Sequence, residues 1–570
     1  MNIKKYMMWG GVALTMGLSS CVGDLDLQPN DPNNVDTSKD PNFIENSLAM
    51  CYSGVTCSGY SGPGSSYVGG IDAGTSAYHR MVFTLNEFCT DEMMWIWPGD
   101  DSGSAGEIMS STWGATNVYV KGAYYRFMGH IAICNQFLRN TEGATDEKTL
   151  EMRAEARVLR AYTYYNLCDL YGQSSFTLDT DPLGQDPVQI SRKDLCDWIE
   201  TELTDIVDNK LISENPSYGR VGLDGAEALL ARLLLNAEVF SGTPRWADCQ
   251  KRCENIIARH QGGGFQGSGL AEHYLYLFAR DNNAYMPGGS NKAENEILFG
   301  FAYDADHTQS YGGPSFVISG TITNSHYIAR QNYGCSSEWS CIRGQQEMAE
   351  RFYTISNQDV RDDLWVRGVL PAGDGWDAED YSDRFLDFSG SWNTTGGNMI
   401  VKFTGRERNA AADGGWNWDT HIDEAGNNVV DQIYFPVTTF ASTDQPVIRL
   451  ADIYLMYTEC NINGGVGERA KALDYMNLIR ERAGAPKVGY SELTKKGLMD
   501  ERSREFYLES IRRTDLVRNG MFAGANQAVW QYKGSLDNNE GTRISAYRTV
   551  YPIPYDVIAA QPEFKQNPGY

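Results

Sequence analysis

Amphipathic helical stripes that recur in pairs are the feature that most limits what this chain can fold into. Apolar residues spaced three and four apart predict helices over 116–140 and 146–171, 192–210 and 223–240, 245–260, 449–462 and 467–483, and 492–518. Small residues such as Ala154, Ala161 and Ala226 fall where paired helices would touch. Helix pairs of this kind favour a mostly α fold with tetratricopeptide-like stacking.

The segments between these pairs have a different composition. Residues 52–115 and 262–447 are rich in Gly, Asn, Ser, Asp and aromatic residues. We expect loops, short strands and isolated helices there, laid over a scaffold formed mainly by 116–260 and 449–518. Long ordered loops of this kind often carry function. We expect residues 38–570 to form one domain.

The first residues of the chain have the pattern of an export signal. Lys4 and Lys5 precede a short apolar run that ends in Leu-Ser-Ser-Cys at Cys21. The run is too short for a spanning helix, so we predict that 1–20 is a lipoprotein signal peptide and that Cys21 is acylated. Residues 21–37 would then be a polar tether. The alternative is an ordinary signal peptide with an incidental cysteine.

Charge and composition narrow the classes of partner. The net charge of −26 argues against nucleic acid, whose phosphates require clustered Lys and Arg. The 13 Trp, 33 Tyr and 21 Phe are more than a core of ordinary composition needs. Such rings at the surface would suit a flat, amphipathic ligand.

No nucleotide-binding, zinc-protease or serine-hydrolase motif occurs in the chain. Spacing alone leaves a glycosidase pair open among the 74 acidic residues, because two such carboxylates meet only in the folded chain. The late helical segment also carries a dense charged cluster, which we interpret as an ion network between packed helices. Its members are Glu501, Arg504, Glu505, Arg512 and Arg513.

The cysteines show no metal-binding spacing. Cys168, Cys196 and Cys460 lie on helical patterns and are expected to be buried. In an oxidising compartment, Cys51 with Cys57 and Cys335 with Cys341 could each form a local disulfide.

Several motifs together resemble the SusD/RagB family of outer-membrane nutrient-binding lipoproteins. They are the acidic DLDLQP segment after Cys21, RAEARVLRAYTYYNLCDLYG, IRLADIYLMYTECNINGG, ERSREFYLESIRRTDLVRNGMF and the ending YPIPYDVIAAQPEFKQNPGY. The resemblance runs along the whole chain. It implies the helix-pair fold, an outer-membrane location through the lipid anchor, and no catalytic activity.

A narrower resemblance to the starch-binding founding type of the family implies a set of glycan contacts. It is carried by the segments HRMVFTLNEFCTDEMMWIWPGDD, YGGPSFVISGT and SSEWSCIRG. The implied contacts are Asp72, Arg80, Trp95, Trp97, Asp100, Tyr311 and Trp339. At Asp100 the founding type has an amide, so this side chain accepts hydrogen bonds but cannot donate as Asn does.

These residue types suit a sugar, which has apolar C–H faces and a rim of hydroxyls. On an extended segment, Trp95 and Trp97 would project to one side, roughly 7 Å apart. The Pro-Gly-Asp-Asp that follows favours an exposed loop, although core packing of both rings is the alternative. Arg80 and Asp72 are interpreted as ligand contacts, with a structural ion pair as the alternative.

The resemblance implies that the chain binds starch-like α-glucan and passes it to a TonB-dependent outer-membrane transporter. A surface glycan hydrolase, or a binder of another glycan or a peptide, are the alternatives. No cofactor is required in this interpretation. A calcium ion is a further implication, with Asn283 and Asp444 as ligands and Ser442 where the family has an Asp.

Overall fold

The computed structural model describes most of the 570 residues, and the statements below concern only these. The described residues are 41–97, 99–283, 293–321, 336–337, 339–353, 359–361, 365–366, 369–370, 379–380, 399–400, 402–405, 420–422, 428–430, 438–535 and 540–570. The signal segment, the tether and Cys21 lie outside them, so acylation remains a prediction. The chain divides into two units, Met1–Ser47 and Leu48–Tyr570, and the site lies wholly in the second.

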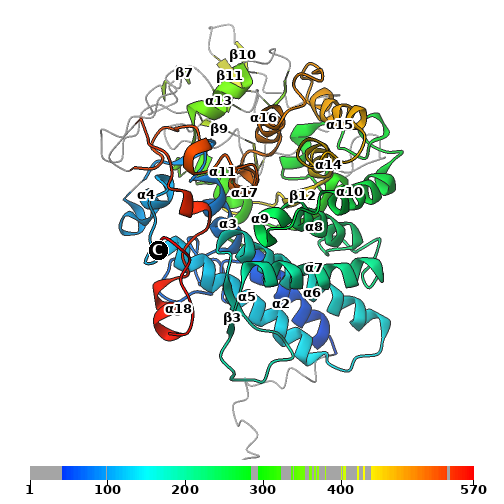
Figure 1. Ribbon diagram of the computed structural model, residues 1–570, viewed down its shortest axis with the longest axis vertical. Coiled ribbons are helices and arrows are strands. Elements are labelled where there is room, and N and C mark those ends of the chain that lie inside the picture. The colour runs from blue at the N-terminus through cyan, green and yellow to red at the C-terminus, as the bar shows by residue number, and fades with distance from the viewer. Residues whose placement is uncertain are drawn as a thin grey trace, which may run out of the picture. The chain divides into compact units, whose positions relative to one another are not determined.

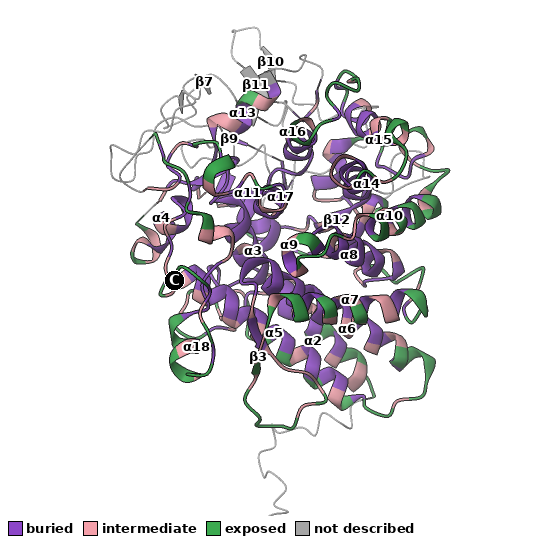
Figure 2. Cartoon of the chain, in the orientation of Figure 1, coloured by how far each residue is buried: buried purple, intermediate pink, exposed green. Residues whose placement is uncertain are grey.

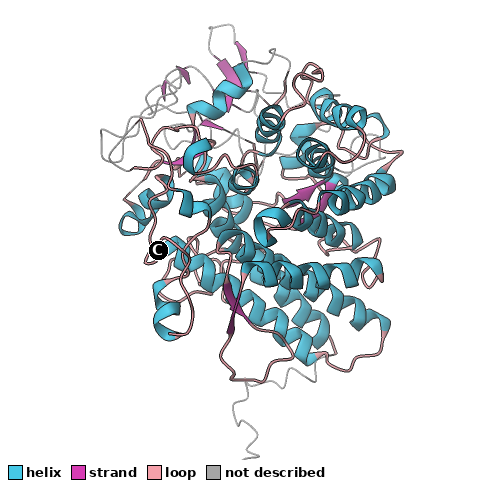
Figure 3. Ribbon diagram, viewed as in Figure 1, coloured by secondary structure: helices cyan, strands magenta, loops and turns pink. Residues whose placement is uncertain are grey.

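The fold is mostly helical, as the hydrophobic periodicity predicts (Figure 1, Figure 3). The helices are α2 (Phe43–Thr56), α3 (Tyr78–Glu87), α4 (Ser104–Met109), α5 (Val118–Asn140), α6 (Glu147–Leu170), α7 (Arg192–Asp208), α8 (Leu223–Leu235), α9 (Ala237–Ser241), α10 (Trp246–His260), α11 (Gly313–Thr321), α13 (Gln346–Tyr353), α14 (Leu450–Gly464), α15 (Arg469–Arg482), α16 (Lys495–Phe506), α17 (Arg512–Arg518) and α18 (Tyr555–Ala560). Among the described residues, no helix is long and apolar enough to cross a bilayer.

The helices stack in series. α5 packs on α6, α6 on α7, α7 on α8, α8 on α10, α10 on α14 and α14 on α15. This order continues across a long gap in sequence, because α10 ends at His260 and α14 begins at Leu450. The loop-rich segment is therefore inserted into the scaffold. Figure 2 shows α3 and α14 buried along almost their whole length.

Side-chain caps set where several helices begin. Asn117 accepts hydrogen bonds from the Tyr119 and Val120 amides before α5, and Asp146 accepts one from Thr149 before α6. Ser191 and Thr494 cap α7 and α16 in the same way. Each cap satisfies amides that have no partner within the helix.

The expectation of one continuous helix over 492–518 is wrong. The chain leaves helical geometry between α16 and α17, where Leu508 and Ser510 have φ of 63° and 66°. The freed groups have partners outside the segment: Lys402 donates to the Glu505 and Tyr507 carbonyls, and the Ser510 amide donates to Glu87 at 2.7 Å. Such contacts can outweigh helical propensity, which is only a weak local preference.

The strands form two-stranded antiparallel ribbons in the described chain. β1 (Met93–Trp95) pairs with β5 (Ile342–Gly344), β2 (Ser174–Phe176) with β3 (Val188–Ile190), and β4 (Ile297–Phe301) with β12 (Gln445–Arg449). The others are β6 (Trp365–Val366) with β9 (Met399–Ile400), β7 (Val369–Leu370) with β8 (Glu379–Asp380), and β10 (Thr420–Ile422) with β11 (Asn428–Val430). The β1–β5 ribbon places Trp95 opposite Ile342, close in sequence to Trp339.

The cysteine predictions have mixed outcomes. Cys168, Cys196 and Cys460 are buried, as expected. The Cys51–Cys57 disulfide is wrong, since the two cysteines form no disulfide in the described structure. Cys51 lies on α2 and Cys57 directly follows it, and residues six apart on a helical path point to different faces. Cys341 is a buried free thiol, and Cys335 lies outside the described residues.

The predicted ion network is confirmed at Glu501 and Glu505. Glu505 contacts Arg449 at 3.0 Å, Arg482 at 2.5 Å and Arg361 at 3.2 Å, and all four side chains are fully buried. Burial alone would raise the pKa of Glu505, but these arginines lower it below its usual value. The carboxylate therefore stays charged inside the protein.

We expect Glu505→Ala to lower the free energy of unfolding by about 3–5 kcal/mol, because it leaves buried guanidinium groups without a counter-charge. Asp197→Ala is the matched control, since it removes an exposed ion pair with Lys193 and should cost about 0.5 kcal/mol or less. Urea unfolding measures both. A loss below about 1 kcal/mol for Glu505→Ala would contradict the structural role of the network.

Candidate functional site

Arg80 lies at the centre of the aromatic residues that the sequence singled out. It is half-buried, whereas every other residue of α3 is buried. Its guanidinium carbon lies 4.4 Å from the ring centre of Phe316, 5.7 Å from Trp95 and 5.8 Å from Trp339. Its Nε is buried and has no hydrogen-bond partner. Ring faces hold the cation here, which leaves N–H donors for a ligand.

Trp95 supports the site from beneath. Its side chain is 4% exposed, and its ring stacks on Phe316 at 5.8 Å. The expectation that it is an exposed platform is therefore wrong. All three β1 residues are buried, so both faces of this strand are covered and the usual in–out alternation is lost.

Trp97 is half-buried and rests on Trp95. The two ring centres are 5.8 Å apart with the planes at 81°, so the expectation that both rings lie on one side is met. The indole N–H of Trp95 donates to the Trp97 carbonyl at 3.0 Å. Trp97 also packs against a small apolar cluster, which comprises Met94, Ile96, Met109 and Tyr532. These contacts hold one edge of Trp97 and leave part of it accessible.

Tyr311 and Trp339 form the second half of the aromatic surface. Both are half-buried, and their ring centres are 6.2 Å apart. Trp339 also lies 6.1 Å from Phe316, and its backbone amide donates to Ser319 of α11 at 2.7 Å. Tyr311 packs on Phe440 at 5.2 Å. The structure thus brings both residues to the neighbourhood of Arg80, as predicted.

Asp72 lies close to Tyr311 and Arg80, and the three side chains surround Gly74. A Cβ atom built on Gly74 would lie 2.8 Å from Tyr311 Cβ, 3.1 Å from Arg80 Nη1 and 3.2 Å from Asp72 Oδ1. Only glycine allows this approach. Asp72 is exposed, and its Oδ1 accepts a hydrogen bond from the Thr75 amide at 3.0 Å. No ion pair joins Asp72 to Arg80 in the described structure, which favours the ligand-contact interpretation.

Asp100 opens a strained turn beside Trp97. Its amide donates to the Trp97 carbonyl at 3.1 Å, and the next residues, Asp101 and Ser102, have φ of 49° and 59°. Left-handed backbone at non-glycine residues costs about 1–3 kcal/mol each and clusters at functional sites. Burial and then Asp101 raise the pKa of Asp100, while Trp95 and Arg80 act against that rise. Asp100 therefore shares the electrostatic environment of Arg80.

The sequence did not single out Phe316 and Phe440, which support the exposed rings. Phe316 lies in the same segment as Tyr311, whereas Phe440 is far from it along the chain, and the supporting role of both depends on packing in the folded protein. The sequence also missed the pair Tyr60 and Tyr67, whose ring centres are 4.0 Å apart. Tyr60 is 66% exposed, and Ser58 of the same loop accepts a hydrogen bond from the Tyr311 amide.

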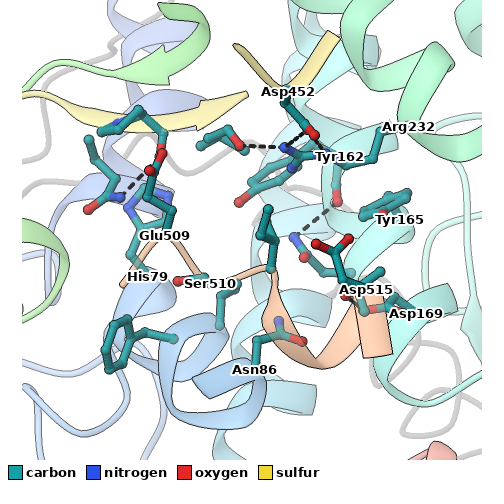
Figure 4. A pocket seen from close by; sticks show the side chains of 18 of the residues that line it. His79, Asn86, Tyr162, Tyr165, Asp169, Arg232, Asp452, Glu509, Ser510 and Asp515 are labelled. Carbon is teal, nitrogen blue, oxygen red and sulfur yellow. Dashed lines mark hydrogen bonds and ion pairs between the residues drawn. The ribbon is translucent and has the colours of Figure 1, made fainter. Parts of the chain in front are cut away.

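A second concavity lies inside the scaffold (Figure 4). Its volume is about 50 Å³, and its wall carries three buried polar atoms without partners, His79 Nε2, Asn86 Oδ1 and Asp169 Oδ1. A polar cavity of this size suits ordered water and is too small for a sugar. The aromatic surface around Arg80 remains the candidate site for a glycan.

The two residues implied as calcium ligands both contact the hydroxyl group of one tyrosine. The Tyr218 hydroxyl lies 3.0 and 2.9 Å from the two Asp444 oxygens and accepts a hydrogen bond from the Asn283 amide at 2.7 Å. The Tyr303 amide donates to Asp444, and Ser442 accepts from Ala305. Calcium takes six to eight oxygen ligands. This single, already bonded carboxylate does not by itself fit that requirement, and calcium binding stays a prediction.

Comparison with known proteins places the chain in a family. A family model described as the SusD family matches residues 295–570. The starch-binding protein SusD of Bacteroides thetaiotaomicron is 30% identical over 574 residues, covering 98% of this chain and 97% of that relative. The chain belongs to the SusD family. The SusD-like protein P25 of Formosa agariphila is 23% identical and covers 76% of this chain and 77% of its own length.

Solved structures agree with the SusD fold. A SusD superfamily protein from Bacteroides vulgatus has a TM-score of 0.64 at 18% identity, covering 92% of this chain and 98% of that one. Surface glycan-binding protein A from Bacteroides thetaiotaomicron, in complex with laminarihexaose, has a TM-score of 0.63 at 16% identity, covering 92% and 99%. These identities support the fold alone. They confirm the predicted helix-rich architecture.

We expect Asp444 to make stability pH-dependent, because burial raises its pKa to about 7. Between about pH 4 and pH 7 the folded chain keeps a proton that the unfolded chain releases, so the free energy of unfolding falls as pH rises. The fall is at most about 4 kcal/mol, since one pKa unit corresponds to about 1.4 kcal/mol.

Asp444→Asn should therefore match the parent protein near pH 4, where the fall begins, and exceed it in stability near pH 8, as measured by denaturant unfolding. Asp186→Asn, at an exposed position, is the control and should shift stability equally at both pH values. A constant difference between Asp444→Asn and the parent across this range would show that Asp444 is ionised throughout.

Proposed function

We propose that this SusD-family protein binds starch-like α-glucan oligosaccharides at the cell surface without altering them chemically. The observation that carries the proposal is the set of half-buried rings, Trp97, Tyr311 and Trp339, gathered near the Arg80 guanidinium. The rings offer apolar faces to the C–H faces of glucose. Arg80 donates to hydroxyls, and the exposed carboxylate of Asp72 accepts from them.

The type of glycan is inferred from the relative with 30% identity, which is named a starch-binding protein. The same aromatic residue types occur here in the segments that resemble it, at Trp95, Trp97, Tyr311 and Trp339. Trp95 contributes from the core by supporting Trp97. Asp100 replaces an amide, so we expect one sugar contact to lose its donor.

The affinity should be weak. Aromatic contacts contribute roughly 0.5–1.5 kcal/mol each beyond area burial, and hydroxyl hydrogen bonds add little net because water competes for them. We therefore expect a dissociation constant between about 0.1 and 1 mM. Anchoring of many copies at a surface would compensate through multivalent attachment to a long polymer.

Surface location and delivery form the rest of the proposal. The lipobox that ends in Cys21 supports a diacylated anchor in the outer membrane. The resemblance to the SusD/RagB family supports a TonB-dependent barrel as the transporter that receives the oligosaccharide. This step of the proposal rests on the family relationship.

We expect Trp97→Ala combined with Trp339→Ala to weaken α-glucan binding about tenfold or more, because both accessible rings are removed while the supporting core remains. Tyr490→Ala is the matched control, since it removes an exposed ring elsewhere on the protein. Retardation in amylopectin gels and calorimetry with maltohexaose and laminarihexaose measure the effect and the linkage preference.

Unchanged retardation in the double variant would place the glycan elsewhere.

A reducing-end assay with amylose separates binding from hydrolysis as the function. Release of new ends by the parent protein, lost in Asp100→Asn, would contradict a purely binding role and support the hydrolase alternative.

A further inference from the structure

A cleft separate from the aromatic site lies between α5, α6, α7 and the chain that follows β2. Its volume is about 400 Å³, within the range of pockets that hold small organic molecules. Its wall includes Leu150, Arg153, Arg157, Arg160, Trp198 and Leu211. The proposed glycan site uses none of them.

Three arginines of α6 face this cleft. Arg153, Arg157 and Arg160 are four and three residues apart, so they lie on one side of the helix. Arg157 pairs with Glu202 at 3.0 Å and with Asp205 at 2.8 Å. Arg160 pairs with Asp179 at 2.6 Å and with Glu202 at 3.3 Å. These two cations are therefore neutralised within the protein.

Arg153 differs from its two neighbours. Its Nη1 donates to the Leu138 carbonyl at 2.5 Å and to the Thr141 hydroxyl at 2.8 Å, and no carboxylate in the described chain pairs with it. Both hydrogen bonds use Nη1, so the edge formed by Nε and Nη2 remains for a ligand. That edge presents two parallel N–H donors, the geometry that a carboxylate accepts in bidentate fashion.

Asp179 and Glu202 line the cleft as the partners of Arg160 and Arg157. Apolar surface is accessible there as well, since Leu150 is 46% exposed and Leu211 is 39% exposed. Trp198 is half-buried, and its ring lies 5.0 Å from Tyr164 and 5.4 Å from the Arg160 guanidinium. A ligand that covers Leu150 and Leu211 removes apolar surface from water, which favours binding.

We propose that this cleft binds an aliphatic carboxylate, with the head group on the Nε–Nη2 edge of Arg153 and the chain against Leu150, Leu211 and Trp198. A neutral apolar ligand would cover Arg153 without satisfying its charge. A small hydrophilic anion would leave the leucines in water. An amphipathic monoanion satisfies both parts of the wall, and it does so in a chain whose net charge of −26 would otherwise repel anions.

The test is calorimetry on the purified protein with sodium octanoate as the probe, compared with 1-octanol, which lacks the charge, and propionate, which lacks the chain. Octanoate should bind at least about tenfold more tightly than either. Arg153→Met should weaken octanoate binding about tenfold or more, because it removes a charge-assisted hydrogen-bond pair. Leu211→Gln should weaken it as well.

Arg139→Met is the matched control. Arg139 donates to the backbone carbonyls of Leu178 and Asp181, and it does not line the cleft. Octanoate binding should be unchanged in this variant. A thermal melt of each variant shows that it is folded, and amylopectin retardation should be normal in Arg153→Met, so failure of this proposal and failure of the glycan site are distinguishable.

Three results would overturn the proposal. They are absence of octanoate binding to the parent protein at millimolar concentration, equal binding of octanol and octanoate, and equal binding of octanoate by folded Arg153→Met and parent protein.

Discussion

Buried charge that is fully paired is the constraint on which this structure depends. Glu501 and Glu505 of α16 lie among arginines from α16 itself and from three other parts of the chain, and the carboxylates and guanidinium groups are almost completely removed from water. The partners are Arg361, Arg449, Arg480, Arg482 and Arg504. Desolvating one such ion costs several kcal/mol, so the arrangement is stable only when every partner is in place.

The network joins the two parts of the domain. Arg480 and Arg482 belong to α15 of the helical scaffold, whereas Arg361 belongs to the inserted loop-rich segment. Lys402, from the same insertion, is also fully buried and pairs with Glu509 at 2.7 Å. The buried charges of either part are therefore paired only when side chains far apart in sequence come together. This requirement fixes the loops on the scaffold more firmly than their own short strands could.

A continuation of the network reaches the aromatic surface. Arg512 of α17 binds both oxygens of Asp91 at 2.8 Å, and Ser503 of α16 donates to Glu92 at 2.6 Å. Asp91 and Glu92 immediately precede β1, which ends at Trp95. Behind this strand, buried Lys533 donates to the Met93 carbonyl at 3.4 Å. The platform under Trp97 is thus held by ionic contacts on one side and by ring packing on the other.

The sequence predicted those parts of the structure that depend on the spacing of neighbouring residues. The paired helices follow from apolar spacing, and the role of Glu501 and Glu505 follows from charges clustered on one helical segment. Trp95 was misjudged because Pro-Gly-Asp-Asp after Trp97 indicates a loop, yet says nothing about what covers β1. Phe316 lies in a segment that resembles the starch-binding type, but nothing in that segment shows which rings the phenylalanine supports, and Phe440 carries no sequence signal of function. The break after α16 depends on Lys402, more than a hundred residues away in the chain.

A crystal structure of the protein with an α-1,4-linked glucose hexasaccharide tests the central claim most directly. We expect sugar rings to lie on Trp97, Tyr311 and Trp339, with hydroxyls bonded to Arg80 and Asp72 and with Trp95 out of contact beneath. Density for the sugar on another surface, with these three rings still bare, would contradict the account.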